Sequence, residues 1–181
     1  METKVLTISG ITAGGKTTLS RSLLNLQPEI KIISFDDYSI DALPSAPSFD
    51  LFKENPLAAI NQYDLSALMN DFNHVYGKFS LILIDFPFGR IHQTLNPFID
   101  QACYVQTPFD IAFARYIQRE YTPQNSAQEI FDWCQTYIQF VHPLVALHEK
   151  IVLPSCDLVL DGTKPPKQNA LQLLQLIQTN S

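Results

Sequence analysis

Short apolar runs alternate with amphipathic stretches along the chain. The apolar runs occupy residues 4–9, 29–34, 81–85, 102–106 and 158–160. The run at 81–85, Leu-Ile-Leu-Ile-Asp, has no polar alternation before its aspartate, which is typical of a parallel strand covered on both faces. Strands that alternate with helices indicate βαβ units. We therefore predict an α/β fold, with a parallel sheet of about five strands flanked by helices.

The spacing of apolar side chains predicts helices between these runs. They cover residues 16–26, 56–76, 109–120, 127–147 and 167–178. Two stretches interrupt the alternation, the proline-containing residues 41–55 and the polar residues 121–126. Because apolar strands resume after each, we predict surface segments rather than domain linkers.

Length and composition indicate one domain with a real core. The chain has 181 residues, of which 46% are hydrophobic and 17% charged, and a domain averages about 150 residues. The net charge of −6 argues against nucleic acid as a partner, since nucleic-acid binders carry a basic patch or stripe. The sequence leaves the oligomeric state open.

The same residues argue against membrane and secretory destinations. No run approaches the ~20 apolar residues that a bilayer span needs, and no basic segment with a cleavage-type site opens the chain. Cys103, Cys134 and Cys156 show no C-x-x-C spacing and are predicted to be reduced, mostly buried thiols. We expect a cytoplasmic protein without a membrane partner.

Residues 10–17, Gly-Ile-Thr-Ala-Gly-Gly-Lys-Thr, fit the pattern G-x-x-x-x-G-K-[ST] between a predicted strand and a predicted helix. Glycines let the backbone turn its N–H groups toward phosphate oxygens, and the helix directs its positive end at the same anion. In this motif Lys16 reaches the β- and γ-phosphates, and the Thr17 hydroxyl binds Mg²⁺. The predicted nucleotide contacts are Gly10, Thr12, Ala13, Gly14, Gly15, Lys16, Thr17 and Thr18.

Three carboxylates follow predicted strands. Asp36 and Asp37 come directly after residues 29–34, and Asp85 ends residues 81–85. The carboxyl ends of parallel strands form the edge at which ligands bind in open α/β sheets. A carboxylate there can hold a metal ion directly or through water, so we predict Asp85 as a metal ligand. The alternative for each is a solvated acid that caps a turn.

Two arginines lie four residues apart, Arg115 and Arg119, and so share one face of the predicted helix 109–120. Planar guanidinium groups match phosphate oxygens and stabilise charge on a phosphoryl group in transfer. We predict a phosphate clamp; the alternative is a surface ion pair with Glu120.

The order of these segments is itself informative. Besides the loop at 10–17, the chain carries Ser-Phe-Asp-Asp-Tyr at 34–38, Ala-Arg-Tyr-Ile-Gln-Arg-Glu at 114–120 and Cys-Asp-Leu-Val-Leu-Asp-Gly at 156–162. Shorter segments lie at 55–58, 63–65 and 140–143. On these residues the chain resembles, over nearly its whole length, the uridine kinase, nicotinamide riboside kinase and phosphoribulokinase group of P-loop small-molecule kinases. The resemblance implies the three-layer P-loop NTPase fold, in one kinase domain over residues 1–181.

The resemblance also implies roles. Asp36 would be the base near the acceptor hydroxyl, Asp85 stands where the family often has a strand-end glutamate, and the two arginines lead into a short lid at 115–126. The implied catalytic residues are Lys16, Asp36, Arg115 and Arg119. The predicted substrate contacts are Asp37, Tyr38, Phe49, Asp64 and Arg90.

Several aromatic and histidine residues admit simpler interpretations. Trp133, Tyr137 and Phe140 are predicted to form a core-facing cluster on one helix. Phe49 and Phe52 either line an acceptor pocket or pin down a loop as two buried rings. The four histidines, His74, His92, His142 and His148, are predicted to be surface or packing residues because none has ligand spacing to cysteines or acids.

These observations predict an ATP-dependent phosphotransferase that uses Mg²⁺ and phosphorylates a hydroxyl of a small metabolite, a nucleoside or riboside by the resemblance. The alternative is a P-loop regulatory ATPase that binds nucleotide without small-molecule kinase activity. A GTPase is disfavoured because the chain has no N-K-x-D sequence.

Overall fold

The computed structural model describes residues 2–179, with side chains through residue 177. Its strands are β1 (Lys4–Ser9), β2 (Lys31–Ser34), β3 (Leu81–Asp85), β4 (Gln101–Gln106) and β5 (Leu158–Asp161). Its α-helices are α1 (Lys16–Leu26), α2 (Phe49–Glu54), α3 (Pro56–Gln62), α4 (Ser66–Val75), α5 (Phe109–Glu120), α6 (Ala127–Thr136), α7 (His142–Val152) and α8 (Pro166–Thr179). Short turns of 3-10 helix are η1 (Phe35–Tyr38), η2 (Ile40–Ala42), η3 (Asn96–Phe98) and η5 (Leu153–Ser155), and η4 (Tyr137–Val141) is π-helical.

The five strands form one sheet in the order β2-β3-β1-β4-β5, and every neighbouring pair is parallel. Asp85 at the end of β3 lies opposite both Ile8 of β1 and Ser34 of β2. The segments that follow these strands therefore leave the sheet at the same edge. The predicted fold class, a parallel sheet between layers of helices, is confirmed.

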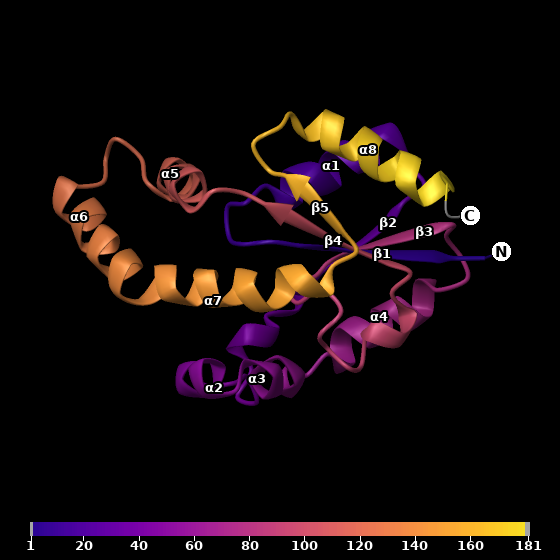
Figure 1. Cartoon of the computed structure of the whole chain (residues 1–181), viewed down its shortest axis with the longest axis horizontal. Helices are drawn as coiled ribbons and strands as arrows, with labels where there is room; N and C mark the ends of the chain where they lie inside the picture. Colours follow the sequence, from indigo (N-terminus) through magenta and orange to yellow (C-terminus); the bar gives the residue numbers. More distant parts are fainter. Residues whose placement is uncertain (1, 180–181) are drawn as a thin grey trace.

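Alternate strand residues enter two apolar layers, one on each face of the sheet. On one face Leu6, Ile8, Leu81 and Leu83 pack with α1 and α8. On the other face Val5, Ile82, Ile84 and Tyr104 pack with residues of α3, α4 and α7. Figure 1 shows α1 and α8 together on one side of the strands and α2, α3 and α4 on the other. Burial on both faces explains why the β3 run shows no polar alternation.

The stretch predicted as one helix over residues 56–76 is two helices. Between α3 and α4, Tyr63 is extended, and the Asp64 carboxylate accepts hydrogen bonds from the Ser66 backbone N–H and hydroxyl. A short polar side chain that binds the backbone two residues on ends one helix and starts another. The proline-containing segment 41–55 is likewise more ordered than predicted, because it contains α2 and buries Phe52.

The helix predicted over residues 127–147 continues to Val152 but changes its pitch at η4, directly before α7. Pro143 has no backbone N–H to donate to the preceding turn, which favours a π-helical irregularity there. Figure 1 shows α5 and α6 standing away from the sheet at the far end of α7. We call α5, α6 and the link between them the arm.

The predicted core position of the helix cluster in the arm is wrong. Trp133 stacks on Tyr116 and Tyr137 packs on Phe113, so both rings cover α5 rather than the sheet. Phe140 is 49% exposed. Trp133 and Tyr137 therefore join α6 and η4 to α5, and neither ring belongs to the main core.

Two further expectations concerned reduced cysteines and the absence of a bilayer-spanning helix. All three cysteines are free, Cys103 buried and the other two partly buried. Within residues 2–179, none of the helices has the length and hydropathy of a bilayer span.

Candidate active site

The loop between β1 and α1 adopts a backbone that its sequence makes possible. Gly10 has a φ of +147°, and a Cβ there would lie 2.7 Å from the Val105 carbonyl oxygen. Gly15, with a φ of +105°, precedes the first residue of α1. Ala13 is also left-handed, at a φ of +57°. Such a conformation is costly for a residue with a Cβ and concentrates at functional sites.

Neighbouring strand ends hold this loop in place. The Thr107 hydroxyl, just past β4, donates to the Gly14 carbonyl at 2.7 Å, and the Gly162 N–H, just past β5, donates to the Gln106 carbonyl at 2.8 Å. Lys16 turns its Nζ back over the loop and donates to the Gly10 and Ile11 carbonyls at 2.9 and 3.2 Å. Thr107 therefore ties the loop to the end of β4, and the Gly162 bond ties the end of β5 to the end of β4.

A cavity of about 470 Å³ lies over the loop and the start of α1; we call it the loop cavity. Four of its lining side chains are cationic and one is acidic: Lys16, Arg115, Arg119, Lys164 and Asp36. The backbone of the loop and the positive end of α1 add to this field. The cavity suits a polyanion. Every predicted nucleotide contact from Thr12 to Thr18 lines it, and Gly10 lies at the neighbouring cavity.

The neighbouring cavity, about 450 Å³, lies on the other side of Lys16; we call it the aromatic cavity. Its aromatic lining consists of Phe35, Phe49, Phe52, Tyr63 and Phe88. Its ionisable lining consists of Lys16, Asp36, Asp41, Asp85 and His148. Both Phe49 and Phe52 line this cavity; Phe52 is also buried in the core, whereas Phe49 is 37% exposed.

The two cavities meet at Thr12, Lys16 and Asp36, which line both. Burial lowers the pKa of Lys16, while the nearby Asp85 and Asp36 carboxylates oppose that shift. Burial raises the pKa of Asp85, and Lys16 opposes it. The boundary thus carries one ammonium group between two carboxylates, on the carboxyl edge of β1, β2 and β3.

The two arginines of α5 both line the loop cavity but are held differently. The Arg115 guanidinium donates to the Gly162 carbonyl at 3.0 Å, which fixes it against the β5–α8 connection. Arg119 pairs with Glu120 at 2.7 Å, so the predicted clamp position and the alternative ion pair occur together. Its side chain is 55% exposed.

The structure corrects the substrate contact predicted for Arg90. Its guanidinium forms an ion pair with Asp157 at 2.6 Å and donates to the Ile99 and Asp100 carbonyls at 2.7 and 2.8 Å. Asp157 and Asp100 directly precede β5 and β4, so Arg90 lies at the amino edge of the sheet. There it links the segments that enter β4 and β5, and it lines neither cavity.

Three other predicted substrate contacts also lie outside both cavities. The Tyr38 hydroxyl donates to Asp71 at 2.9 Å, and Asp64 caps α4. Asp37 is exposed, one residue beyond Asp36. Of the substrate contacts predicted from sequence, Phe49 alone lines the aromatic cavity.

Several lining residues could not be selected from the sequence. Asp41 comes from the segment predicted to be a surface loop, Gly162 follows the last strand, and Asn169 lies in α8. His148, predicted to be a surface or packing residue, donates its Nε2–H to the Pro87 carbonyl at 2.7 Å and lines the aromatic cavity. Burial lowers its pKa to about 4, so it is neutral at pH 7.

The residues that could help to hold a metal ion are few. Among the described residues no group of three or more histidine, cysteine, aspartate or glutamate side chains gathers as a metal site. The Asp85 carboxylate and the exposed Thr17 hydroxyl are oxygen donors on the two sides of Lys16. Mg²⁺ prefers oxygen ligands and usually binds through one or two carboxylates together with substrate phosphates, so this donor set fits Mg²⁺.

Solved structures with this fold include two shikimate kinases and a sugar kinase. A shikimate kinase from Acinetobacter baumannii in complex with shikimate is 16% identical, with a TM-score of 0.59 over 99% of this chain and 95% of that one. A sugar kinase from Janibacter sp. is also 16% identical, with a TM-score of 0.58 over 97% and 95%. Shikimate kinase from Aquifex aeolicus is 15% identical, with a TM-score of 0.52 over 97% of each chain.

No protein-family profile and no curated protein matches the sequence. At these identities the structural likeness shows a shared fold alone. The closer resemblance to the uridine kinase group stays a prediction.

Proposed function

We propose that the chain is an ATP-dependent kinase that transfers the γ-phosphoryl group to a hydroxyl of a small metabolite. One observation carries the proposal: a cationic cavity over a phosphate-binding loop meets a second, ligand-sized cavity at Lys16 and Asp36. A nucleotide switch needs only the first cavity. The fold shared with shikimate and sugar kinases supports the same conclusion.

In this proposal ATP occupies the loop cavity. Loop N–H groups and Lys16 bind the β- and γ-phosphates, and the guanidinium groups of Arg115 and Arg119 approach the phosphoryl group in transfer. Fixed cationic groups stabilise the charge of the transition state without having to reorganise during the reaction. The arm carries both arginines and acts as the lid.

The acceptor occupies the aromatic cavity with its hydroxyl next to Asp36. A hydroxyl is a poor nucleophile at neutral pH, so a carboxylate within reach must accept its proton as the bond to phosphorus forms. The acceptor oxygen forms a bond to the γ-phosphorus, the bond from that phosphorus to the β,γ-bridging oxygen breaks, and ADP leaves. Asp36 suits this role because it lines both cavities.

We assign the Mg²⁺ contacts to Thr17 and Asp85. When bound, Mg²⁺ neutralises charge on the phosphate oxygens. Asp85 is 8% exposed, with Lys16 nearby as a partially compensating charge. A second cation at this carboxylate would also offset the cost of burying it.

The acceptor we favour is a nucleoside or riboside. Its flat ring would pack on the aromatic lining while ribose hydroxyl groups approach the carboxylates, and the sequence resemblance supports the same class. The free thiols fit a reducing compartment, and on that ground we place the enzyme in the cytoplasm.

The test is ADP release from ATP and Mg²⁺ with a panel of alcohols: nucleosides, other ribosides, pantothenate, glycerate and shikimate. We expect turnover with at least one member and a phosphorylated product by mass spectrometry. ATP binding without turnover on any member would favour the regulatory ATPase instead.

A further inference from the structure

The loop cavity extends beyond the residues that bind phosphate. Its lining at the β5–α8 connection consists of Gly162, Lys164, Pro166 and Asn169, and none of these lines the aromatic cavity. Under the proposed function the γ-phosphate lies at Lys16, where the two cavities meet. The rest of the nucleotide therefore extends away from the aromatic cavity, and its base lies at the β5–α8 connection.

Asn169 is a buried polar side chain at this end of the cavity. It is 3% exposed, and its Nδ2 donates to the Asp161 carbonyl at 2.9 Å. Because a carbonyl only accepts, this bond fixes the orientation of the amide and directs Oδ1 away from the Asp161 carbonyl. Among the described residues, no group donates a hydrogen bond to this buried Oδ1. A buried acceptor without a donor is destabilising, so a ligand that supplies the donor gains affinity.

The backbone N–H groups of the β5–α8 connection are already used. Those of Gly162, Thr163 and Lys164 donate to acceptors within the chain, and the prolines at 165 and 166 have none. The Arg115 guanidinium donates to the Gly162 carbonyl at 3.0 Å, and the exposed Lys164 ammonium suits phosphate oxygens. The buried group that still needs a hydrogen-bond partner here is therefore an acceptor, Asn169 Oδ1.

Purine bases differ in the group that they would present to this oxygen. Adenine carries a 6-amino group, which donates, where guanine and hypoxanthine carry a 6-oxo group, which accepts. An amino group at Asn169 would pair with Oδ1, whereas an oxo group would bring two acceptors together with no hydrogen between them. Sites built to hydrogen-bond one group reject analogues that lack it, because the buried partner is then left unpaired.

We propose that Asn169 selects the phosphate donor: its Oδ1 accepts a hydrogen bond from the 6-amino group of adenine, and the chain thereby uses ATP in preference to 6-oxopurine nucleotides. The inference rests on the proposed function and adds the residue that distinguishes the bases. Asn169 is then a specificity-determining residue that touches the nucleotide at the end opposite to the transferred phosphoryl group. Because Oδ1 is enclosed in the structure, we expect the side chains around it to move aside as the base enters.

Three nucleotides that differ at one position of the purine ring test the preference: ADP with a 6-amino group, purine riboside 5′-diphosphate with hydrogen, and IDP with a 6-oxo group. Each is titrated calorimetrically into the full chain with Mg²⁺ present. Diphosphates bind without phosphoryl transfer, so the result does not depend on the acceptor. We expect ADP to bind about tenfold more tightly than purine riboside diphosphate, and IDP to bind at least as weakly as the latter.

One variant and one control locate the preference at Asn169. Asn169→Leu keeps the shape of the side chain and removes the acceptor, so the preference for ADP over purine riboside diphosphate should fall to about twofold or less. The affinity for purine riboside diphosphate should stay within about threefold, which also shows that the cavity is intact. If the leucine variant does not fold, Asn169→Ala takes its place. Gln168→Leu, at the exposed neighbouring position of α8 outside the cavity, should leave all three affinities unchanged.

Equal affinities for the three nucleotides, tighter binding of IDP, absence of binding by ADP, or a preference that survives removal of the Asn169 amide would each overturn the inference. Failure of the proposed function is a different result, the absence of phosphoryl transfer to any alcohol of the panel. A preference for ADP that is lost in Asn169→Leu, together with no transfer to any alcohol, would keep the base contact and remove the kinase. Transfer that proceeds equally well from ATP and ITP would keep the kinase and remove the role of Asn169.

Discussion

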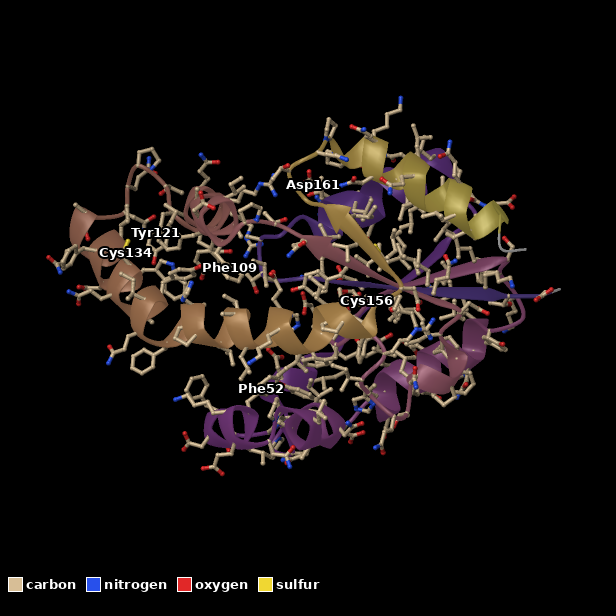
Figure 2. All side chains as sticks on the ribbon, viewed as in Figure 1. Phe52, Phe109, Tyr121, Cys134, Cys156 and Asp161 are labelled. Atoms are coloured by element: carbon tan, nitrogen blue, oxygen red, sulfur yellow. The ribbon has the colours of Figure 1, made fainter. Side chains whose placement is uncertain are left out.

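The two cavities differ in how they are built as well as in charge. The loop cavity is shaped largely by the backbone of the loop, which the Thr107 hydroxyl binds at Gly14, and cationic side chains line the cavity beside it. The aromatic cavity is shaped by side chains from η1, η2, α2, β3 and α7. Figure 2 labels Phe52 between α2 and the strands, and Asp161 on the opposite side at β5.

Under the proposed function, this difference assigns the two halves of the reaction. A triphosphate is the same in every kinase, so a rigid backbone can bind it, whereas an acceptor is recognised by whatever side chains surround it. Lys16 and Asp36 line both cavities, so these two side chains can contact both the phosphate donor and the acceptor. Changes in the loop cavity should therefore affect turnover with every acceptor, and changes in the aromatic cavity should affect acceptors selectively.

The largest effect is expected from Lys16→Ala. Loss of the ammonium group from the boundary should lower kcat by about a thousandfold or more, because it removes charge stabilisation from the transition state. The midpoint of thermal unfolding should stay within a few degrees of that of the unmodified protein, since burial already disfavours the charged form of Lys16. An unaltered kcat would contradict a role of Lys16 and the phosphate-binding loop in phosphoryl transfer.

The arm arginines come next. Arg115→Ala and Arg119→Ala should each lower kcat/KM by about a hundredfold with every acceptor, since both guanidinium groups belong to the loop cavity. Arg21→Ala, an exposed arginine on α1 outside the cavity, is the matched control and should have normal kinetics. A fall in kcat/KM with one acceptor only would mean that the arginines act on the acceptor in the aromatic cavity instead.

A smaller effect on stability should come from His148. Its folded-state pKa, about 4, lies below the ordinary 6.5, so the unfolded chain binds more protons and stability present above pH 6.5 is lost as the pH falls toward 4. From about pH 7.5 to about pH 5 this lowers the free energy of unfolding by about 2 kcal/mol. His148→Gln, whose amide can still donate to the Pro87 carbonyl, should show a correspondingly smaller loss in urea denaturation. Identical pH dependence of the two proteins would contradict the buried, neutral imidazole.

The smallest signal is expected from movement of the arm. Trp133 is the only tryptophan of the chain and stacks on Tyr116, with ring centroids 4.8 Å apart. Figure 2 shows Tyr121 and Cys134 near each other at the outer end of the arm. If the arm closes on nucleotide, ATP should change the tryptophan fluorescence, and the Arg115→Ala/Arg119→Ala double variant should lose that change. A fluorescence spectrum indifferent to ATP would argue for a fixed arm.

The loop cavity could be predicted from sequence because its parts are contiguous. The motif at 10–17 specifies a turn, a helix start and a lysine within eight residues, and its geometry follows from glycine and helix chemistry alone. The strands could also be predicted from the sequence, because burial on both faces makes them continuously apolar. Helix breaks were harder: the one at Tyr63 depends on a single side chain, Asp64, binding the Ser66 backbone.

The aromatic cavity could not be predicted because its residues meet only in three dimensions. Asp41 and His148 are more than one hundred positions apart, and each has an ordinary local interpretation. Arg90 was predicted to contact substrate because it follows a strand that ends at the site. Its long side chain instead reaches the other edge of the sheet, where it forms an ion pair with Asp157. Position along the chain fixes the backbone, and tertiary contacts decide the direction of a long side chain.

The central claim, transfer from the loop cavity to the aromatic cavity across Asp36, is tested most directly by Asp36→Asn. The amide keeps the size of the side chain but cannot accept a proton from the acceptor. We predict a fall in kcat of about a hundredfold or more while the Kd for ATP changes by about threefold or less. Near-normal turnover in Asp36→Asn, with turnover lost in Asp85→Asn or Asp37→Asn, would contradict the account and locate the base elsewhere.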